Sequence, residues 1–266
     1  MRLRLAWSCL TVTLTLAFTP ARGATVDLGA WSAESYPAVS GFGAGVWTPS
    51  SGGDSVQQSV NGQPTLFYSD FTAIGTDIQG VIRVAGGDDD YIGFALGFEP
   101  GGSSSASADF LLVDWKQGTQ AFDFGPPSNT PGSTALAGLA VSRITGIPTA
   151  DEFWGHTDFV SNPGGGLVEL ARGATLGGTG WSTNVDYTFR FVFGASRLRV
   201  FVDGLEELDV SGSFDDGRLA FYNFSQAGVT YSAFTVDVPE PSGLLLGLCA
   251  AVALVLLRPT RRAADC

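Results

Sequence analysis

The sequence of 266 residues contains 26 Asp and Glu residues against 14 Lys and Arg residues, which gives a formal net charge of −12. Residues 25–237 hold 24 of the acidic and 8 of the basic residues, a net charge of −16. A surface this acidic repels nucleic acids, so a nucleic-acid-binding function is excluded. It attracts cations, although acidic residues also keep secreted proteins soluble.

The first 24 residues have the pattern of a secretory signal peptide. Arg2 and Arg4 precede an uncharged run at 5–19, and residues 21–23 form a small-x-small cleavage pattern. The run is too short to favour a permanent anchor. All three cysteines (Cys9, Cys249 and Cys266) lie outside residues 25–237. The exported domain at 25–237 must therefore be stabilised by its apolar core or by bound metal, not by disulfides.

Short apolar runs, separated by Gly, Ser and Asp, predict β-strands throughout this domain. In the run at 187–193, alternation places Phe189, Phe191 and Phe193 on one face. In the run at 197–202, Arg197 and Arg199 lie on the face opposite the apolar residues. No segment has a sustained helical period, so we expect an all-β sandwich or jelly roll in one domain. The predicted strands are 77–84, 91–98, 109–115, 187–193, 197–202, 205–210, 218–224 and 229–236.

Three consecutive aspartates, Asp88, Asp89 and Asp90, lead directly into the predicted strand at 91–98. Adjacent carboxylates repel one another, so such a run is either solvated or bound to a cation. Calcium takes several oxygen ligands, often from carboxylates. The run therefore raises the question of a metal-dependent module.

Several short motifs resemble the C-terminal lectin-like domain of thrombospondins. They occur in the same order as in that family and cover roughly residues 45–236. Each motif is weak alone, but the ordered set is specific. The matching segments are 59–61, 76–80, 88–94, 114–117, 154–157 (with one extra residue), 180–181 with Tyr187, 217–221 and 224–226.

The resemblance implies a concanavalin A-like jelly-roll β-sandwich, bound calcium, and a role in adhesion or matrix contact. Asp88, Asp89 and Asp90 match the acidic run of the family and are the expected calcium ligands. Asp114 has no firm match and is a weaker candidate. Two departures matter: this chain lacks both the calcium-binding repeats that precede the domain in thrombospondins and the cysteines of the domain. The receptor interactions of thrombospondins are therefore not carried over.

His156 is the only histidine in the chain. A catalytic triad would have to use it with Asp151 or Asp158 and a distant serine, but no Gly-x-Ser-x-Gly motif marks a nucleophile. A zinc site would need more His or Cys ligands than the domain has. The family match favours a structural hydrogen-bonding role for His156. Its neighbour Trp154 is the preferred ligand contact, with a buried core aromatic as the alternative, and His156 is a candidate ligand-binding residue beside it.

Glycoside hydrolysis is the serious enzymatic alternative, because it needs only two carboxylates that flank a sugar. The candidates are Glu169 and the pair Glu206 and Glu207. The pair follows a turn and is expected to be solvated, while Glu169 stands alone in the sequence. We therefore expect a protein that is not an enzyme.

The C-terminal segment, residues 238–262, resembles the PEP-CTERM sorting signal of Gram-negative bacteria. An uncharged run follows the Pro-Glu-Pro element, and basic residues follow the run, so a short transmembrane segment is expected at 243–257. The resemblance implies an exosortase-type processing enzyme as partner and a transient inner-membrane anchor. The residues that carry it are Pro239, Glu240, Pro241, Arg258, Arg261 and Arg262.

Together these features predict an exported adhesion or matrix module, located in the cell envelope, at the cell surface or outside the cell. Polysaccharide or a matrix protein is the expected ligand, with calcium as the cofactor. A purely structural surface or biofilm protein is the alternative.

Overall fold

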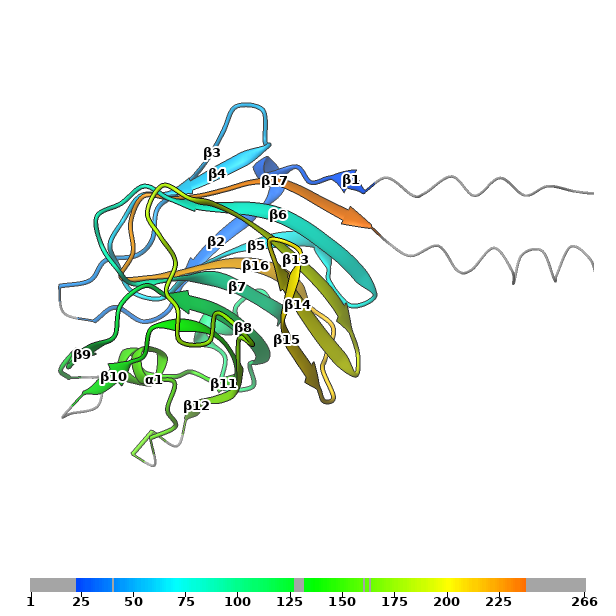
Figure 1. The fold of residues 1–266 in the computed structure, drawn as a ribbon. Helices are drawn as coiled ribbons and strands as arrows, with labels where there is room; N and C mark the ends of the chain where they lie inside the picture. Colours follow the sequence, from blue (N-terminus) through cyan, green and yellow to red (C-terminus); the bar gives the residue numbers. More distant parts are fainter. Residues whose placement is uncertain (1–22, 40, 127–131, 160, 163, 238–266) are drawn as a thin grey trace, which may run out of the picture.

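The computed structural model describes residues 23–39, 41–126, 132–159, 161–162 and 164–237. These residues form two antiparallel sheets stacked as a sandwich, with a small two-stranded sheet beside them, so the predicted all-β sandwich is confirmed (Figure 1). Among the described residues, no helix is long and apolar enough to cross a membrane. The predicted signal peptide up to residue 22 and the whole predicted sorting signal at 238–262 lie outside these residues.

The larger sheet has eight strands within the described residues. Its first strand, β1 (Ala24–Thr25), pairs with its last, β17, so that Ala24 lies opposite Val236. The two ends of the described chain therefore leave the sandwich side by side (Figure 1). The other strands follow the order β15 (Leu205–Ser211), β14 (Arg197–Val202), β13 (Asp186–Gly194), β6 (Thr76–Val84), β17 (Val229–Asp237), β4 (Ser55–Gln58) and β3 (Trp47–Pro49).

The second sheet has seven strands within the described residues, and short elements cover part of it. Its strand order is β12 (Gly165–Arg172), β11 (Gly138–Gly146), β8 (Asp109–Lys116), β7 (Tyr91–Phe98), β16 (Arg218–Phe224), β5 (Thr65–Thr72) and β2 (Ser32–Ser35). The remaining elements are the paired strands β9 (Gln120–Phe122) and β10 (Ser133–Ala135), the helix α1 (Ala150–Gly155) and two 3-10 turns, η1 (Leu28–Ala30) and η2 (Gly102–Ser104).

The main apolar core fills the space between the two sheets. Phe189, Phe191 and Phe193 of β13 all belong to it, as their alternation in the sequence predicts. Arg197 and Arg199 of β14 lie on the opposite face, as predicted, where they pair with carboxylates of β15. Burial of large aromatic side chains such as these contributes much of the stability of a disulfide-free domain.

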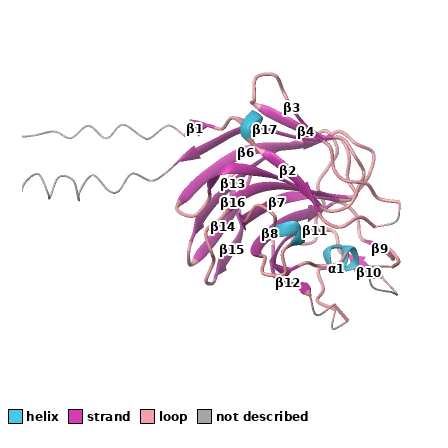
Figure 2. Ribbon diagram, turned by 180° about the vertical axis from the view of Figure 1, so that it is seen from behind, coloured by secondary structure: helices cyan, strands magenta, loops and turns pink. Residues whose placement is uncertain are grey.

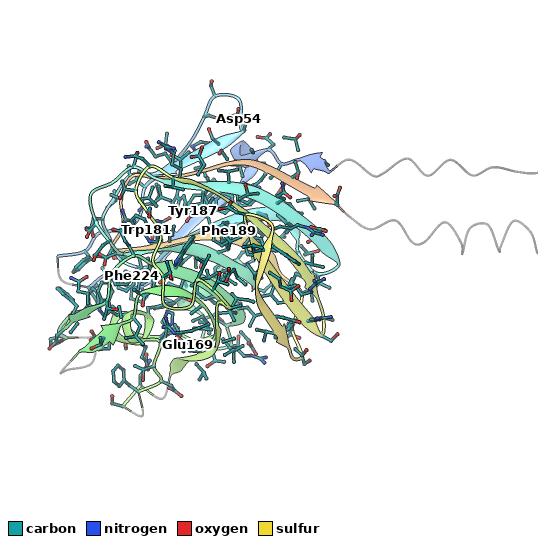
Figure 3. All side chains as sticks on the ribbon, in the orientation of Figure 1. Asp54, Glu169, Trp181, Tyr187, Phe189 and Phe224 are labelled. Atoms are coloured by element: carbon teal, nitrogen blue, oxygen red, sulfur yellow. The ribbon has the colours of Figure 1, made fainter. Side chains whose placement is uncertain are left out.

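A second apolar cluster covers the outer face of the seven-stranded sheet. It is roofed by helix α1 and the β9–β10 pair, which lie together on one side of the molecule (Figure 2). Strand β7 is buried along its whole length because it has a cluster on each face: Ile92 and Phe94 belong to the first cluster, Tyr91 and Ala95 to the second. Phe189 of the first cluster and Phe224 of the second are labelled in Figure 3.

Candidate functional site

The three consecutive aspartates lie in the loop between β6 and β7. Strands β6 and β17 are antiparallel: Val84 at the end of β6 pairs with Val229 at the start of β17, and Asp77 near the start of β6 pairs with Asp237 at the end of β17. The loop is therefore at the end of the sandwich far from the paired chain ends. One carboxylate oxygen from each of the three aspartates lies within 4.8 Å of the others, and among the described residues this is the one group of three or more metal-ligating side chains with that spacing.

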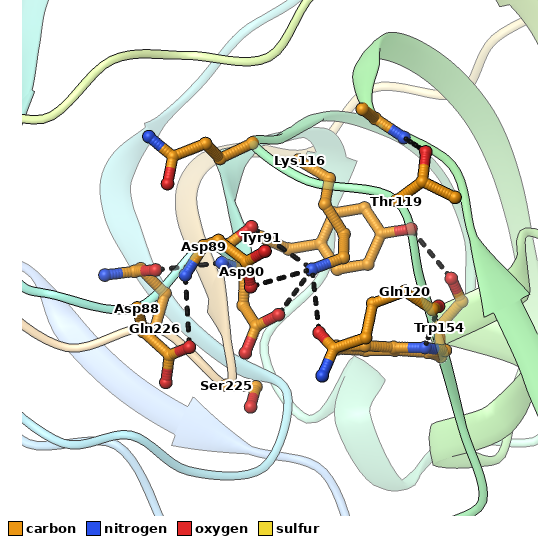
Figure 4. A network of polar contacts seen from close by, with 12 residues as sticks. Asp88, Asp89, Asp90, Tyr91, Lys116, Thr119, Gln120, Trp154, Ser225 and Gln226 are labelled. Carbon is orange, nitrogen blue, oxygen red and sulfur yellow. Dashed lines mark hydrogen bonds and ion pairs between the residues drawn. The ribbon is translucent and has the colours of Figure 1, made fainter.

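Asp90 faces inward and is paired with Lys116 at the end of β8. The ammonium Nζ lies 2.5 Å from Asp90 Oδ1, and the Lys116 side chain is completely buried (Figure 4). Nζ also donates to the carbonyl oxygen of Asp89 at 3.1 Å and to Gln120 Oε1 at 3.4 Å, and it lies 4.5 Å above the ring of Trp154. Burial raises the pKa of Asp90 to about 6, against the opposing hydrogen bond and charge of Lys116.

Side chains from distant parts of the sequence hold the outer part of the run. Asn61 Nδ2 donates to Asp88 Oδ2, and Ser225 Oγ donates to Asn61 Oδ1 at 3.1 Å. The backbone N–H of Asp90 donates to Gln226 Oε1 at 3.0 Å. These residues belong to segments that are matched to the thrombospondin domain in the sequence, at 59–61, 88–94 and 224–226. The fold brings those segments together at this one loop.

Two further matched segments meet at the backbone of the same loop. The indole Nε1 of Trp181 donates to the carbonyl oxygen of Asp90 at 3.1 Å, and Gln117 Nε2 donates to the carbonyl oxygen of Trp181 at 2.9 Å. The backbone N–H of Gln117 donates to the carbonyl oxygen of Asp89 at 3.1 Å. The loop is thus fixed through its backbone as well as through its side chains.

The outer carboxylates suit a hard cation such as calcium. The Asp89 side chain is 44% exposed and Asp88 is half-buried, so water can complete the coordination of an ion held there. Calcium binds oxygen at 2.3–2.6 Å, so two ligand oxygens of one ion are at most about 5 Å apart. The spacing of the three carboxylates is compatible with that limit. Among the three aspartates, Asp88 and Asp89 are the ones that could hold such a cation, because Asp90 is 5% exposed and paired with Lys116.

Asp114, the weaker metal candidate, does not join the aspartate run. It is fully buried on β8, opposite Gly93, and its Oδ2 lies 3.0 Å from Nε2 of His156. The other imidazole nitrogen, Nδ1, lies 3.0 Å from Glu169 Oε2 on β12, which is labelled in Figure 3. Arg172 then donates to both Glu169 oxygens, at 2.9 and 2.8 Å. These four residues form a chain of alternating charges that is buried at Asp114 and His156 and partly exposed at Glu169 and Arg172.

The pKa values in this chain follow from burial and charge pairing. Burial alone would lower the pKa of His156, but the two carboxylates outweigh it and raise the value to about 9. Burial raises the pKa of Asp114, partly offset by His156. For Glu169, burial is outweighed by hydrogen bonds from His156 and Arg172, which lower its pKa. His156 is therefore a charged, structural group at neutral pH, in the hydrogen-bonding role expected from the sequence.

Trp154 does not offer a ring face to a ligand. It lies in helix α1, not in a loop, and it is 1% exposed. Its Nε1 donates to the carbonyl oxygen of Gln120 at 3.0 Å, and its ring packs against Phe124 and Phe224 at centroid distances of 5.5 and 5.6 Å. The expected ligand contact is corrected to a core aromatic. The side chain of His156, 5% exposed, is equally covered.

The carboxylates considered for glycoside hydrolysis are engaged in structural contacts. Glu169 is held by His156 and Arg172, as described above. Glu206 pairs with Arg199 on the exposed face of the larger sheet. Glu207 is 4% exposed, which corrects the expectation that it is solvated; it accepts hydrogen bonds from the backbone N–H groups of Thr175 and Leu176.

Lys116 and Gln120 were not identified from the sequence as parts of the site. Alternation along the strand at 109–115 places residue 116 on the same face as Asp114, so the sequence predicts the face of the sheet on which Lys116 lies. The salt bridge was not, because it joins two strands whose register no single sequence reveals. Lys116 is the only lysine in the chain, and this composition is the one signal in the sequence that singles out position 116.

Comparison with known proteins places these residues in a family. The family model described as Thrombospondin C-terminal region matches residues 44–239. Thrombospondin-4 of Bos taurus is 28% identical over 198 residues, covering 70% of this chain and 19% of the relative. Thrombospondin-2 of Mus musculus is 26% identical over 201 residues, covering 70% of this chain and 16% of the relative. The chain thus corresponds to about a fifth or less of the length of these relatives.

A solved structure, the carbohydrate-binding module CBM66 from Bacillus subtilis, superposes with a TM-score of 0.47 at 11% identity and covers 74% of this chain and 99% of the module. That similarity is too low to support an argument on function. The family match, in contrast, covers well over half of the sequence and all of the site residues described above. This chain belongs to the thrombospondin C-terminal region family.

Proposed function

We propose that this chain is an exported, calcium-binding adhesion or matrix module, which binds polysaccharide or a matrix protein and is not an enzyme. The observation that carries the calcium proposal is the convergence on one loop of segments far apart in the sequence. Asn61, Lys116 and Gln226 all contact the aspartate run, while the side chain of Asp89 remains 44% exposed. A loop fixed in this way keeps its outer carboxylates close together despite their repulsion, and a bound cation would relieve that repulsion.

A calcium titration of the mature protein tests this proposal. Saturating calcium at about 100 times Kd stabilises a folded protein by about 2.7 kcal/mol, which for a domain of this size raises Tm by about 5–10 °C. We expect this rise in the wild type, with a much smaller rise in Asp89→Asn. Asp70→Asn, which neutralises an exposed aspartate on β5, is the matched control and should respond like the wild type. A Tm that is insensitive to calcium would refute the proposal.

The ligand proposal rests on family membership and on surface charge. Relatives in the family include proteins named thrombospondins, and the strongly acidic domain disfavours polyanionic ligands such as nucleic acids. A neutral polysaccharide or a matrix protein with basic patches fits this charge. A glycan array with calcium present, together with binding to immobilised matrix proteins, tests the proposal. No binding on either surface would favour the alternative, a purely structural envelope protein.

The absence of enzymatic activity is proposed because the candidate carboxylates are engaged in structural contacts. Glu169 and Glu207 are held by hydrogen bonds, and Glu206 is paired with Arg199 on an exposed sheet face. General acid catalysis needs a carboxyl group whose proton is available to the substrate. Release of reducing sugar from a polysaccharide panel, lost in Glu169→Gln, would overturn this part of the proposal.

Sorting by the C-terminal signal is proposed from the sequence, and the fold is compatible with it. Strand β17 ends at Asp237, two positions before the first proline of the Pro-Glu-Pro element, and it ends far from the aspartate run. A domain held at its C-terminus would thus present the run away from the membrane. The mature mass in a host that encodes an exosortase, with and without substitution of residues 239–241, tests the sorting. An uncut C-terminus in both cases would refute it.

A further inference from the structure

We propose that Lys116 is the resident cation of the aspartate run, so that calcium is held by Asp88 and Asp89 without Asp90, and the ammonium sets the calcium affinity. This inference rests on the calcium binding proposed above and assigns different roles to the three aspartates. Three observations carry it: the oxygen-rich surroundings of Nζ, the different exposure of the three carboxylates, and the short distance between the ammonium and the carboxylate of Asp89.

The surroundings of Nζ resemble those of a bound metal ion. A carboxylate oxygen of Asp90, a backbone carbonyl oxygen of Asp89 and an amide oxygen of Gln120 face it at 2.5, 3.1 and 3.4 Å, and the ring of Trp154 closes the remaining side at 4.5 Å (Figure 4). Lys116 is the only lysine of the sequence and has no exposed surface. A buried charge is tolerated only when such partners replace its hydration.

The three carboxylates are divided between the inside and the outside of the loop. The Asp90 side chain is 5% exposed and points to Lys116, whereas that of Asp89 is 44% exposed. Asp88 faces Asn61 on the outside. The backbone of Asp90 directly before β7 is held on both sides, since its N–H donates to Gln226 and its carbonyl oxygen accepts from Trp181, so its side chain cannot turn outward without moving the start of β7. Asp90 is therefore the closer partner of the lysine at 2.5 Å, against 3.6 Å for Asp89, and the two more exposed carboxylates are those that can reach calcium.

The ammonium is close enough to weaken calcium binding. Nζ lies 3.6 Å from Asp89 Oδ1, so a calcium ion on Asp89 would be within a few ångströms of a fixed positive charge. Repulsion over this distance is poorly screened in a buried setting. Removal of the charge should thus tighten calcium binding, although it removes no ligand oxygen. That direction distinguishes Lys116 from a residue that merely supports the fold.

Isothermal titration with calcium, on the full mature protein, tests the assignment. We expect Asp89→Asn, which removes a ligand oxygen, to weaken binding at least tenfold more than Asp90→Asn, which removes no ligand oxygen and acts only by leaving the charge of Lys116 unpaired. Lys116→Met, which keeps the apolar stem against Trp154, should tighten binding at least tenfold. Arg143→Gln removes a distant positive charge paired with Asp109 and is the matched control; it should change the affinity less than twofold. Equal losses in Asp89→Asn and Asp90→Asn, or no gain in Lys116→Met, would overturn the inference.

The outcomes separate this inference from the calcium proposal itself. Binding in the wild type with equal losses at both aspartates refutes the inference alone. Binding in Lys116→Met but not in the wild type refutes calcium binding by the native protein and supports the resident cation. Binding in neither protein refutes both. Asp90→Asn/Lys116→Met, which leaves no buried charge unpaired, guards against misfolding of Lys116→Met and should bind calcium more tightly than Asp90→Asn does.

A second measurement needs no variant. Since the chain has one lysine, acylation by an amine-reactive ester followed by mass spectrometry reports on Nζ and the α-amino group alone. We expect only the α-amino group to react in the folded protein, both with and without calcium. Calcium-induced acylation of Lys116 would show that the metal displaces the ammonium, and the inference would then be wrong.

Discussion

Nε2 of His156 lies 3.0 Å from Oδ2 of Asp114, and this contact attaches the end of helix α1 to the seven-stranded sheet. His156 caps the helix in the left-handed region, with φ at 49°, and its side chain then reaches β8 below. A capping box formed by Thr149 and Glu152 fixes the other end of the helix. Helix α1, which covers the second apolar cluster, is therefore held in place by polar contacts at both of its ends.

Replacement of His156 by alanine should destabilise the fold by about 3–5 kcal/mol, because Asp114 would remain as a buried carboxylate without its partner. Denaturant unfolding with a tryptophan fluorescence readout measures this loss. Asp114→Asn/His156→Ala, which leaves no charge unpaired at Asp114, should be more stable than His156→Ala alone. A loss below 1 kcal/mol in His156→Ala would show that the imidazolium does not hold helix α1 on the seven-stranded sheet.

Stability should fall as the pH rises through 9. The pKa of His156 is about 9 in the folded protein and about 6.5 when unfolded, so the folded state holds the proton more tightly. Its contribution is complete below pH 6.5 and is lost above pH 9, a change of about 3 kcal/mol for a shift of this size. Unfolding free energies at intervals between pH 6 and 9.5 measure it. His156→Ala should lack this slope, and an equal slope in both proteins would assign the effect to other groups.

The sheet architecture was predictable from residues whose burial follows a simple period. The strands predicted at 91–98, 197–202 and 218–224 have those bounds in the structure, and Phe189 and Phe191 face the core as their alternation requires. Strands β5, β11 and β12 were missed, as were the short strands β1 to β4, β9 and β10. Strand β12 exposes both Val168 and Leu170 at an edge, so its pattern of burial does not follow its pattern of hydrophobicity.

The site was predictable only in part, since its polar partners are set by tertiary register. The aspartate run was identified from adjacent charges, and Asn61 was matched only as part of a motif. The burial of Trp154 was only the alternative interpretation, because the helix that carries it is six residues long and has no room for a periodic pattern. Its start signal, Thr149 followed by Glu152, is nonetheless visible in the sequence.

The lack of a side chain at Gly93 is required for the packing of β7 against β8. A Cβ atom there would lie 2.2 Å from the carbonyl oxygen of Val113 and 2.8 Å from the Cα atom of Asp114. Gly93→Ala should therefore destabilise the fold by about 1–3 kcal/mol or more, because the backbone of β8 must move. Gly178→Ala is the control, since no atom lies within 4 Å of its added Cβ atom. Equal stabilities by thermal unfolding would show that the two strands separate at little cost.

The adjacent residues Glu206 and Glu207 should respond very differently to alanine substitution. Glu207 accepts hydrogen bonds from the backbone N–H groups of Thr175 and Leu176, at 2.8 and 3.0 Å, and thereby ties the segment after β12 to β15. Loss of hydrogen bonds to a buried charged group costs about 1.5–3 kcal/mol each, and unpaired N–H groups add to this. Glu206 forms an ion pair with Arg199, both about one-third exposed, and such pairs contribute less than about 1 kcal/mol.

Denaturant unfolding of Glu206→Ala and Glu207→Ala at the same pH measures this contrast. The two variants remove the same charge from neighbouring positions, so any difference reflects the contacts and not the net charge. Hydrogen bonds from Thr175 and Leu176 outweigh burial and lower the pKa of Glu207, so its contribution is present above the unfolded pKa and lost as the pH falls through the folded pKa. The two variants should therefore become more alike in acid, and a gap that persists after Glu207 is protonated would assign its cause to packing instead of charge.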